Sequence, residues 1–365
     1  MVRYIIKELY LIFVSLIQML CAKQRVQRDH IVVMMTFKED MLPIIDQLIE
    51  RGYRVTVFTK EAHFQALANK KNVACQSLAQ RNLYRQLRAL STAKVIFIDT
   101  YYHLFGAIKK QANQTVIQTW HAAGALKNFG LEDHAVNVHD RKSVAQYQAV
   151  YDATDKYLVG CSQMAHCFER SFGVAEHQFL NFGIPRLAYY LEIDVSQQQR
   201  ELKQQLGIQN KVAVYLPTYR EDGQANRVID QQAFERALPD YTLLSKYHPA
   251  IQSPDTEHRV TLSTYELLIL ADVIITDYSS LAIEASLIGK PAIFYVYDAQ
   301  DYERVRGLNA YYEAIPNTYK VYTETALHQR LAQGNLEPLF EDWHTFNTKE
   351  SVHQLMNYVD KVVRI

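Results

Sequence analysis

Several side chains that bind or transfer charged groups stand where predicted strands end. His121 follows a short apolar strand at Gln114–Gln118 and precedes small residues, a lysine and a glycine in QTWHAAGALKNFG. His248 stands before Pro249, which favours an extended conformation at the histidine. Arg186 lies in FGIPR, and its planar guanidinium suits phosphate oxygens. Imidazole titrates near neutral pH, so a site for a charged substrate is one interpretation of these positions.

Hydroxyl groups occupy similar positions in the second half of the chain. Ser279 and Ser280 stand where a strand gives way to a helix in TDYSSLAIEA, and Thr218 follows another strand. Hydroxyls and N–H groups at a helix start bind phosphate, although a serine there is also a common N-cap. Glu284, one turn into the helix, is placed to accept hydrogen bonds from ribose hydroxyls. A protonated His248 would neutralise a leaving phosphate.

The spacing of apolar runs predicts an α/β protein with two Rossmann-like domains that face a cleft. A chain of 365 residues is long for one core, and strands alternate with segments of helical length. The predicted helices include Met41–Arg51, Thr264–Ala271, Leu281–Gly289 and Glu350–Val363. The predicted strands are His30–Phe37, Arg54–Thr59, Lys94–Thr100, Gln114–Gln118, Lys156–Gly160, Lys211–Leu216, Tyr241–Lys246, Asp272–Thr276 and Ala292–Tyr297.

The two halves also contain similar segments in the same order. MTFKED (35–40) and PTYRED (217–222) each follow the first strand of a half, and VIFIDT (95–100) later matches VIITDY (273–278). We expect domains at residues 26–195 and 196–365, with the last helix packing back on the first domain. Ligands of open α/β sheets bind beyond the carboxyl ends of the strands. A lone histidine is more often structural, so the prediction of one site depends on convergence. The residues at strand ends or in the loops after them are His121, Arg186, Thr218, His248 and Ser279.

Composition excludes some classes of function. Basic and acidic residues number 39 each, so no net charge draws the chain to nucleic acid. Four scattered cysteines indicate a reducing compartment, by default the cytosol, rather than a disulfide scaffold. Cys161, His166 and Cys167 lie close in sequence, but no second ligand pair has zinc-site spacing, and we expect no metal there.

The pattern of polar and apolar residues in 1–25 predicts an amphipathic helix. The apolar run in YLIFVSLIQML is too short to span a bilayer, and no small-residue cleavage site follows it. On a helical wheel one arc is polar, and the other side holds Ile5, Leu9, Ile12, Phe13, Leu16 and Leu20. Two interpretations stay open: the helix lies in a membrane interface, which we favour, or it covers the core of the first domain.

The order of several motifs resembles the CDP-glycerol glycerophosphotransferase family, which builds teichoic acids in Gram-positive bacteria. The motifs are TWHAAGALKNFG, FGIPR, LPTYRED, KYHP, TDYSSLAIEAS and PAIFYVYD, and the resemblance covers nearly the whole chain. That family is similar in fold to GT-B glycosyltransferases. Family members more often have glycine after the motif histidine and proline near position 125, whereas Ala122 and Ala125 stand here.

The resemblance implies a reaction and a role for each site residue. His121 would be the general base, and His248 would stabilise the phosphates. The reaction would transfer sn-glycerol 3-phosphate from CDP-glycerol to an N-acetylmannosamine hydroxyl of an undecaprenyl-diphosphate-linked disaccharide at the cytoplasmic face of the membrane, releasing CMP. No Asp-X-Asp pair is present, so we expect no required cofactor or metal. The family's CDP-glycerol contacts correspond to Arg186, Thr218, Tyr219, His248, Ser279, Ser280 and Glu284.

Other functions stay open at this stage. Family polymerases commonly have additional N-terminal sequence, so this short chain favours a priming enzyme over a glycerol- or ribitol-phosphate polymerase. A GT-B glycosyltransferase that uses a nucleotide sugar would have the same fold. A non-catalytic membrane scaffold would tolerate replacement of His121. Other teichoic acid enzymes are expected as partners.

Overall fold

Two compact units make up the chain. The computed structural model describes residues 2–21, 24–218, 220, 228–247 and 262–365. Contacts group Met1–His121, Val136–Tyr189 and Thr345–Ile365 into the first unit, and Ala122–Ala135 and Tyr190–His344 into the second. The second unit therefore includes Ala122–Ala135, the segment directly after His121. A domain boundary at residue 195 would instead place this segment in the first domain.

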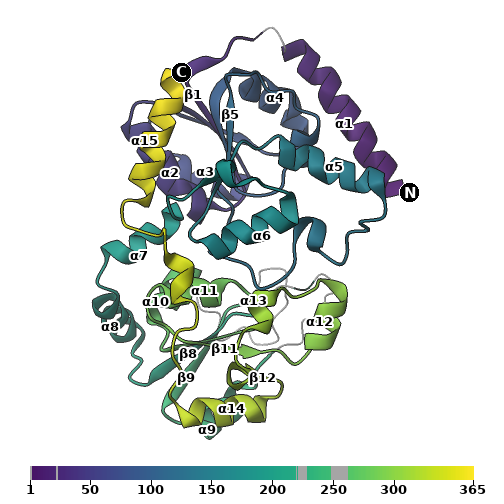
Figure 1. Cartoon of the computed structure of the whole chain (residues 1–365). Coiled ribbons are helices and arrows are strands. Elements are labelled where there is room, and N and C mark those ends of the chain that lie inside the picture. Colours follow the sequence, from purple (N-terminus) through teal and green to yellow (C-terminus); the bar gives the residue numbers. More distant parts are fainter. Residues whose placement is uncertain (1, 22–23, 219, 221–227, 248–261) are drawn as a thin grey trace. The chain divides into compact units, whose positions relative to one another are not determined.

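A seven-stranded parallel sheet forms the centre of the first unit (Figure 1). Its order is β3-β2-β1-β4-β5-β6-β7, so β1 and β4 are neighbours although β2 and β3 lie between them in the sequence.

 Strand β1 pairs in parallel with β2 on one side and with β4 on the other, with Met34 beside Ile98. The strands are β1 (Gln27–Met35), β2 (Arg54–Thr59), β3 (Val73–Ser77), β4 (Ala93–Ile98), β5 (Thr115–Gln118), β6 (Lys156–Leu158) and β7 (Phe179–Leu180).

Alternate residues of β1 face the two sides of this sheet, as the period of a strand requires. Ile31, Val33 and Met35 pack under α2 (Lys38–Glu50) and α15 (Ser351–Arg364). Val32 and Met34 belong to a separate cluster on the other side. The helices of that cluster are α1 (Val2–Cys21), α4 (Leu83–Thr92) and α5 (Arg141–Asp152).

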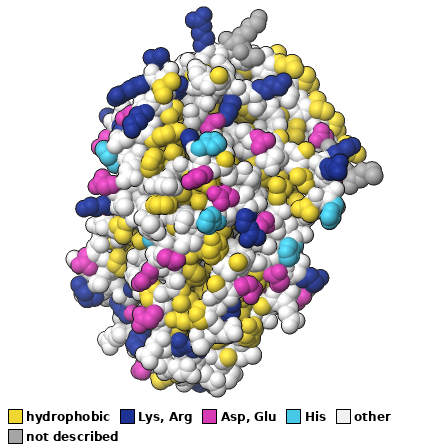
Figure 2. All heavy atoms as spheres, viewed as in Figure 1, with side chains coloured by type: hydrophobic (Ala, Val, Ile, Leu, Met, Phe, Trp, Pro, Cys, Tyr) yellow, Lys and Arg dark blue, Asp and Glu magenta, His cyan; other side chains and the backbone are white. Residues whose placement is uncertain are grey.

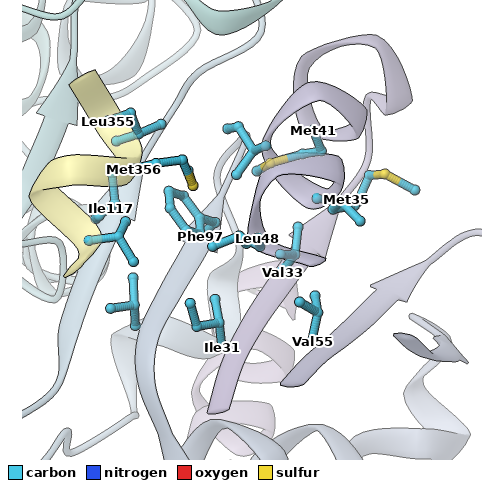
Figure 3. Packing of buried hydrophobic residues seen from close by; sticks show 14 of the residues in the cluster. Ile31, Val33, Met35, Met41, Leu48, Val55, Phe97, Ile117, Leu355 and Met356 are labelled. Carbon is cyan, nitrogen blue, oxygen red and sulfur yellow. The ribbon is translucent and has the colours of Figure 1, made fainter. Parts of the chain in front are cut away.

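The C-terminal helix α15 completes the first core although it lies far away in sequence. Leu355 and Met356 are fully buried, and Figure 3 shows them beside Phe97 and Ile117 of the sheet. Tyr53 donates a hydrogen bond to Asp360 of this helix over 2.6 Å. Helices α3 (Phe64–Leu67), α6 (Ser162–Phe172) and the start of α7 (Ala188–Glu192) complete the unit.

The second unit has a five-stranded parallel sheet in the order β12-β11-β10-β8-β9. Its strands are β8 (Lys211–Tyr215), β9 (Tyr241–Ser245), β10 (Val273–Thr276), β11 (Ala292–Tyr295) and β12 (Lys320–Val321). Its helices are α8 (Val195–Leu206), α9 (Gln231–Ala237), α10 (Thr264–Leu270), α11 (Leu281–Ser286), α12 (Ala299–Val305), α13 (Ala310–Glu313) and α14 (Glu324–Gln333).

The prediction of an α/β protein with two Rossmann-like domains and an N-terminal helix is confirmed. All nine predicted strands are present, with ends that shift by a few residues. The prediction missed β3, β7 and β12. Strand β3 has no fully buried residue, and the other two have two residues each, so none gives a clear apolar run.

The buried face of α15 gives a first prediction. Leu355→Ala removes a fully buried side chain from the first core and should lower the free energy of unfolding by about 2–5 kcal/mol. Lys361→Ala, at an exposed position of the same helix, should change it by less than about 0.5 kcal/mol. Urea unfolding of both variants measures the difference, and equal effects would contradict the packing of α15 on this sheet.

Candidate active site

His121 is fixed by a hydrogen bond to the main chain and by aromatic contacts. Its Nδ1 lies 2.8 Å from the carbonyl oxygen of Asp99, which only accepts, so Nδ1 carries the proton. The lone pair of the neutral ring is then on Nε2. The imidazole stacks on Phe37 with ring centroids 4.3 Å apart and contacts Trp120 at 4.5 Å. The ring is thus oriented with the basic nitrogen opposite the anchored one.

The side chain of Asp99 holds the loop that carries Phe37. Its Oδ2 accepts hydrogen bonds from the backbone N–H groups of Thr36 (2.6 Å) and Phe37 (2.7 Å). Tyr102 donates to Oδ1 over 2.7 Å. Burial raises the pKa of Asp99 to about 6, while the hydrogen bonds from Phe37, Tyr102 and Thr36 act in the opposite direction. Asp99 therefore supports His121 through both its main chain and its side chain.

Trp120 has an unusual backbone conformation directly before His121. Its φ of 60° is in the left-handed region of backbone conformation, which residues other than glycine seldom adopt. Its N–H donates to Gln118 over 2.9 Å, and its ring meets Phe168 and Phe172 of α6 edge-on. These contacts stabilise a turn that places consecutive aromatic side chains at the end of β5. No residue pattern around Trp120 indicates this backbone conformation.

Arg186 also belongs to the first unit, in a short 3₁₀ turn at Pro185–Leu187. Its Nε lies 3.0 Å from Oδ1 of Asp40, and both side chains are largely buried. Asp40 is in the first turn of α2 and ends the MTFKED segment. Sequence analysis missed this acidic partner, although the repeat of the segment singled out its position.

In the second unit Thr218 is anchored as Thr36 is in the first. Its N–H and hydroxyl both donate to Oδ1 of Asp277, over 3.0 and 2.5 Å. Arg220 donates to the other oxygen of Asp277 over 3.1 Å and lies over the ring of Tyr302 at 4.2 Å. The structure places Thr218 at the carboxyl end of β8, where the sequence predicted it.

Ser279, Ser280 and Glu284 surround the start of α11. Ser279 Oγ accepts a hydrogen bond from the N–H of Leu281 over 3.2 Å, while Ser280 makes no side-chain cap. Glu284 is only 4% exposed and accepts a hydrogen bond from Tyr190 over 3.1 Å. The predicted contact of Glu284 with ribose stays a prediction. Tyr219 and His248 lie outside the described residues.

The segment after His121 packs within the second unit. A Cβ on Gly124 would meet the ring of Trp343 at 2.4 Å, so the absence of a side chain allows this contact. Asn309 donates to the carbonyl oxygen of Ala125 over 2.8 Å. Burial lowers the pKa of Lys127 and the nearby Asp277 carboxylate raises it. Sequence analysis assigned no role to Lys127, which brings a cation close to the anchor of Thr218.

Within the described ranges, no group of three His, Cys, Asp or Glu side chains is arranged to hold a metal ion. Two parallel-sheet units with titratable, hydroxyl and basic groups at their strand ends define the class as a GT-B-like α/β protein. A solved structure of the wall teichoic acid polymerase TagF has a TM-score of 0.76 with the chain at 20% identity, covering 100% of this chain and 98% of that one.

Sequence comparison identifies the family. Residues 20–357 match the model of the CDP-Glycerol:Poly(glycerophosphate) glycerophosphotransferase family. The chain is 48% identical to a teichoic acid glycerol-phosphate primase of Staphylococcus aureus (strain NCTC 8325 / PS 47), over 98% of this chain and 99% of the relative. A primase of Bacillus subtilis (strain 168) is 29% identical over 99% of both. The chain belongs to this glycerophosphotransferase family.

The buried carboxyl of Asp99 gives a pH-dependent prediction. Its folded-state pKa of about 6 lies above the ordinary value of 3.8, so the protonated form favours folding and this stability is lost as pH rises through about 6. Asp99→Asn removes the titration. Between pH 4 and 7 the native protein should lose on the order of 3 kcal/mol of unfolding free energy relative to the variant.

Urea unfolding at several pH values measures this difference, and parallel curves would contradict it. The same variants test the support of His121. Asparagine retains an oxygen for the Thr36 and Phe37 N–H groups, so Asp99→Asn should keep most of the transfer activity. Asp99→Ala leaves both N–H groups without this acceptor and should lower kcat.

Proposed function

We propose that the protein primes a teichoic acid chain by transferring glycerol phosphate from CDP-glycerol to a lipid-linked acceptor. The observation that carries the proposal is the 48% identity to a teichoic acid glycerol-phosphate primase across nearly both chains. The orientation of His121 supports it, because the anchored Nδ1 leaves Nε2 as the basic atom. The acceptor is the N-acetylmannosamine hydroxyl of an undecaprenyl-diphosphate-linked disaccharide.

The reaction exchanges one phosphorus–oxygen bond for another. The acceptor oxygen attacks the phosphorus that carries glycerol, and its proton passes to Nε2 of His121. The bond from that phosphorus to the bridging oxygen breaks, and CMP leaves with this oxygen. Phosphoryl transfer depends mainly on positioning and on stabilising charge. Donor contacts are assigned to Arg186, Thr218, Tyr219, His248, Ser279, Ser280 and Glu284.

The N-terminal helix supports attachment to the cytoplasmic face of the membrane. Its predicted apolar side is exposed: Leu9 is 61% accessible, Phe13 55% and Leu16 55%. Figure 2 shows apolar side chains along the edge where α1 runs in Figure 1. Lys7 instead lies over the ring of Tyr147, and Gln18 exchanges hydrogen bonds with the backbone of Lys109. In the described ranges no helix is long and apolar enough to cross a bilayer.

The role of His121 as general base is tested by measuring the rate of CMP release from CDP-glycerol, with and without the lipid-linked disaccharide. His121→Ala and His121→Asn should each lower the rate by about 10²- to 10⁴-fold, because neither side chain is a base. His139→Ala, at an exposed histidine of the same unit, should retain the rate. Mass spectrometry of the lipid should show one added glycerol phosphate.

A ladder of additions would indicate a polymerase, and release that does not depend on the acceptor would indicate a different acceptor or donor. Activity of His121→Asn close to that of the native enzyme would show that His121 is not the base.

The exposed face of α1 is tested with vesicles of phosphatidylcholine alone. Replacing Leu9, Phe13 and Leu16 with glutamine should lower vesicle binding by roughly 10- to 100-fold, because these side chains would no longer enter the apolar interface. The matched control replaces three exposed apolar residues of the second unit: Leu206, Val305 and Tyr322. Co-sedimentation measures binding, and equal losses in both triple variants would contradict a specific role of α1.

A further inference from the structure

A polar hollow of about 350 Å³ lies in the first unit, away from His121. It is within the range of small-molecule sites, roughly 300–1,000 Å³. The hollow is formed by the starts of β1 and β2, by β3, by α4 and by the segment after α1. Its lining residues are Gln24, Gln27, Arg54, Thr56, Gln76, Arg85, Arg88, Ala89 and Thr92. We call it the arginine pocket.

The lining carries positive charge and no acidic side chain. Arg85 and Arg88 are exposed residues of α4, three positions apart, so they share one face of the helix. Among the described residues neither has an ion-pair partner. Arg54 donates to Gln27 and has only a distant, exposed pairing with Asp29 at 3.7 Å. Arginine binds phosphate oxygens through paired N–H donors.

Neutral polar groups lie beneath these arginines. Buried His30 links two lining hydroxyls, with Nδ1 3.0 Å from Thr92 and Nε2 2.9 Å from Thr56. Burial, together with Arg54, lowers the pKa of His30 to about 4, so the ring is neutral at neutral pH. The buried side-chain amide oxygen of Gln76, Oε1, has no hydrogen-bond partner among the described residues. A ligand hydroxyl would satisfy this oxygen.

The arginine pocket is separate from the candidate active site. Gln27 begins β1 and Arg54 begins β2, so the pocket lies at the amino ends of these strands. His121, Asp99 and Phe37 stand at the carboxyl ends. Nine residues of β1 span about 30 Å at 3.3 Å per residue. A ligand held in the pocket would therefore be separate from one at His121.

The exposed apolar face of α1 ends beside the arginine pocket. Met19 and Leu20 are 67% and 73% exposed, and Gln24, which lines the pocket, bonds back to Cys21 at the end of the helix. Helix α4, which carries Arg85 and Arg88, packs against α1. We propose that the arginine pocket binds the phosphate-bearing head group of an anionic membrane lipid. The inference rests on the proposed membrane attachment through α1 but not on the transfer reaction.

Two vesicle compositions test the proposal on the full chain. The first is phosphatidylcholine alone, and the second contains a minority of phosphatidylglycerol, whose head group has a phosphate and hydroxyls. The native protein should bind the second more tightly. Replacing Arg85 and Arg88 with glutamine should lower binding to the anionic vesicles by roughly 10- to 30-fold and leave binding to neutral vesicles unchanged.

Two further variants separate a pocket from general surface charge. Ala89→Leu fills the hollow without changing charge and should also weaken binding to the anionic vesicles. Replacing Arg200 and Arg236 of the second unit with glutamine removes the same charge and should have less than a twofold effect. Unfolding in urea confirms that each variant is folded. Equal losses in the two arginine pairs, or no loss in Ala89→Leu, would overturn the pocket assignment.

Inorganic phosphate distinguishes the source of the anion. Titration calorimetry with inorganic phosphate should show weak binding at most. Tight phosphate binding that requires Arg85 and Arg88, with vesicle binding unchanged in the variant, would assign the pocket to a free phosphate and overturn the lipid proposal. Failure of the native protein to bind neutral vesicles would instead count against α1, and CMP release with a detergent-dispersed acceptor tests the reaction independently.

Discussion

Asp99 connects the end of one strand to both neighbouring loops of the candidate active site. Its carbonyl oxygen accepts from His121, and its carboxylate accepts from Thr36 and Phe37. A buried carboxylate is costly without such donors, and these N–H groups are costly without an acceptor. The loop after β1 and the loop after β5 are therefore held by one residue. The orientation of the imidazole follows from that arrangement.

The second unit has a matching aspartate that also holds a neighbouring loop by hydrogen bonds. Asp277 follows β10 as Asp99 follows β4, and it holds Thr218 after β8 as Asp99 holds Thr36 after β1. The two aspartates occupy the same position in the matching segments VIFIDT and VIITDY. In the first unit a histidine joins the arrangement, while in the second Arg220 binds the aspartate. The repeat thus preserves the support of a loop and varies the group that the loop presents.

Periodicity predicted the strands because buried parallel strands are continuous apolar runs, as at Arg54–Thr59. Edge strands such as Val73–Ser77 lack that signal. The positions of Thr218, Ser279 and His121 at strand ends also followed from the sequence. Partners distant in the chain did not: nothing local pairs Arg186 with Asp40, or Glu284 with Tyr190. The helical wheel separated two sides of α1, but only tertiary contacts show that Lys7 and Gln18 face protein while Leu9 faces outward.

The path of the chain has a consequence for motion. The chain passes between the units after His121, after Ala135, after Tyr189 and after His344. Any rotation of one unit against the other must be absorbed by backbone torsions at these four crossings. One crossing is the peptide bond that follows His121, and the preceding Trp120 already has a restricted left-handed conformation. This crossing is adjacent to the imidazole in the covalent chain, so a change of torsion there would also act on His121, the proposed base.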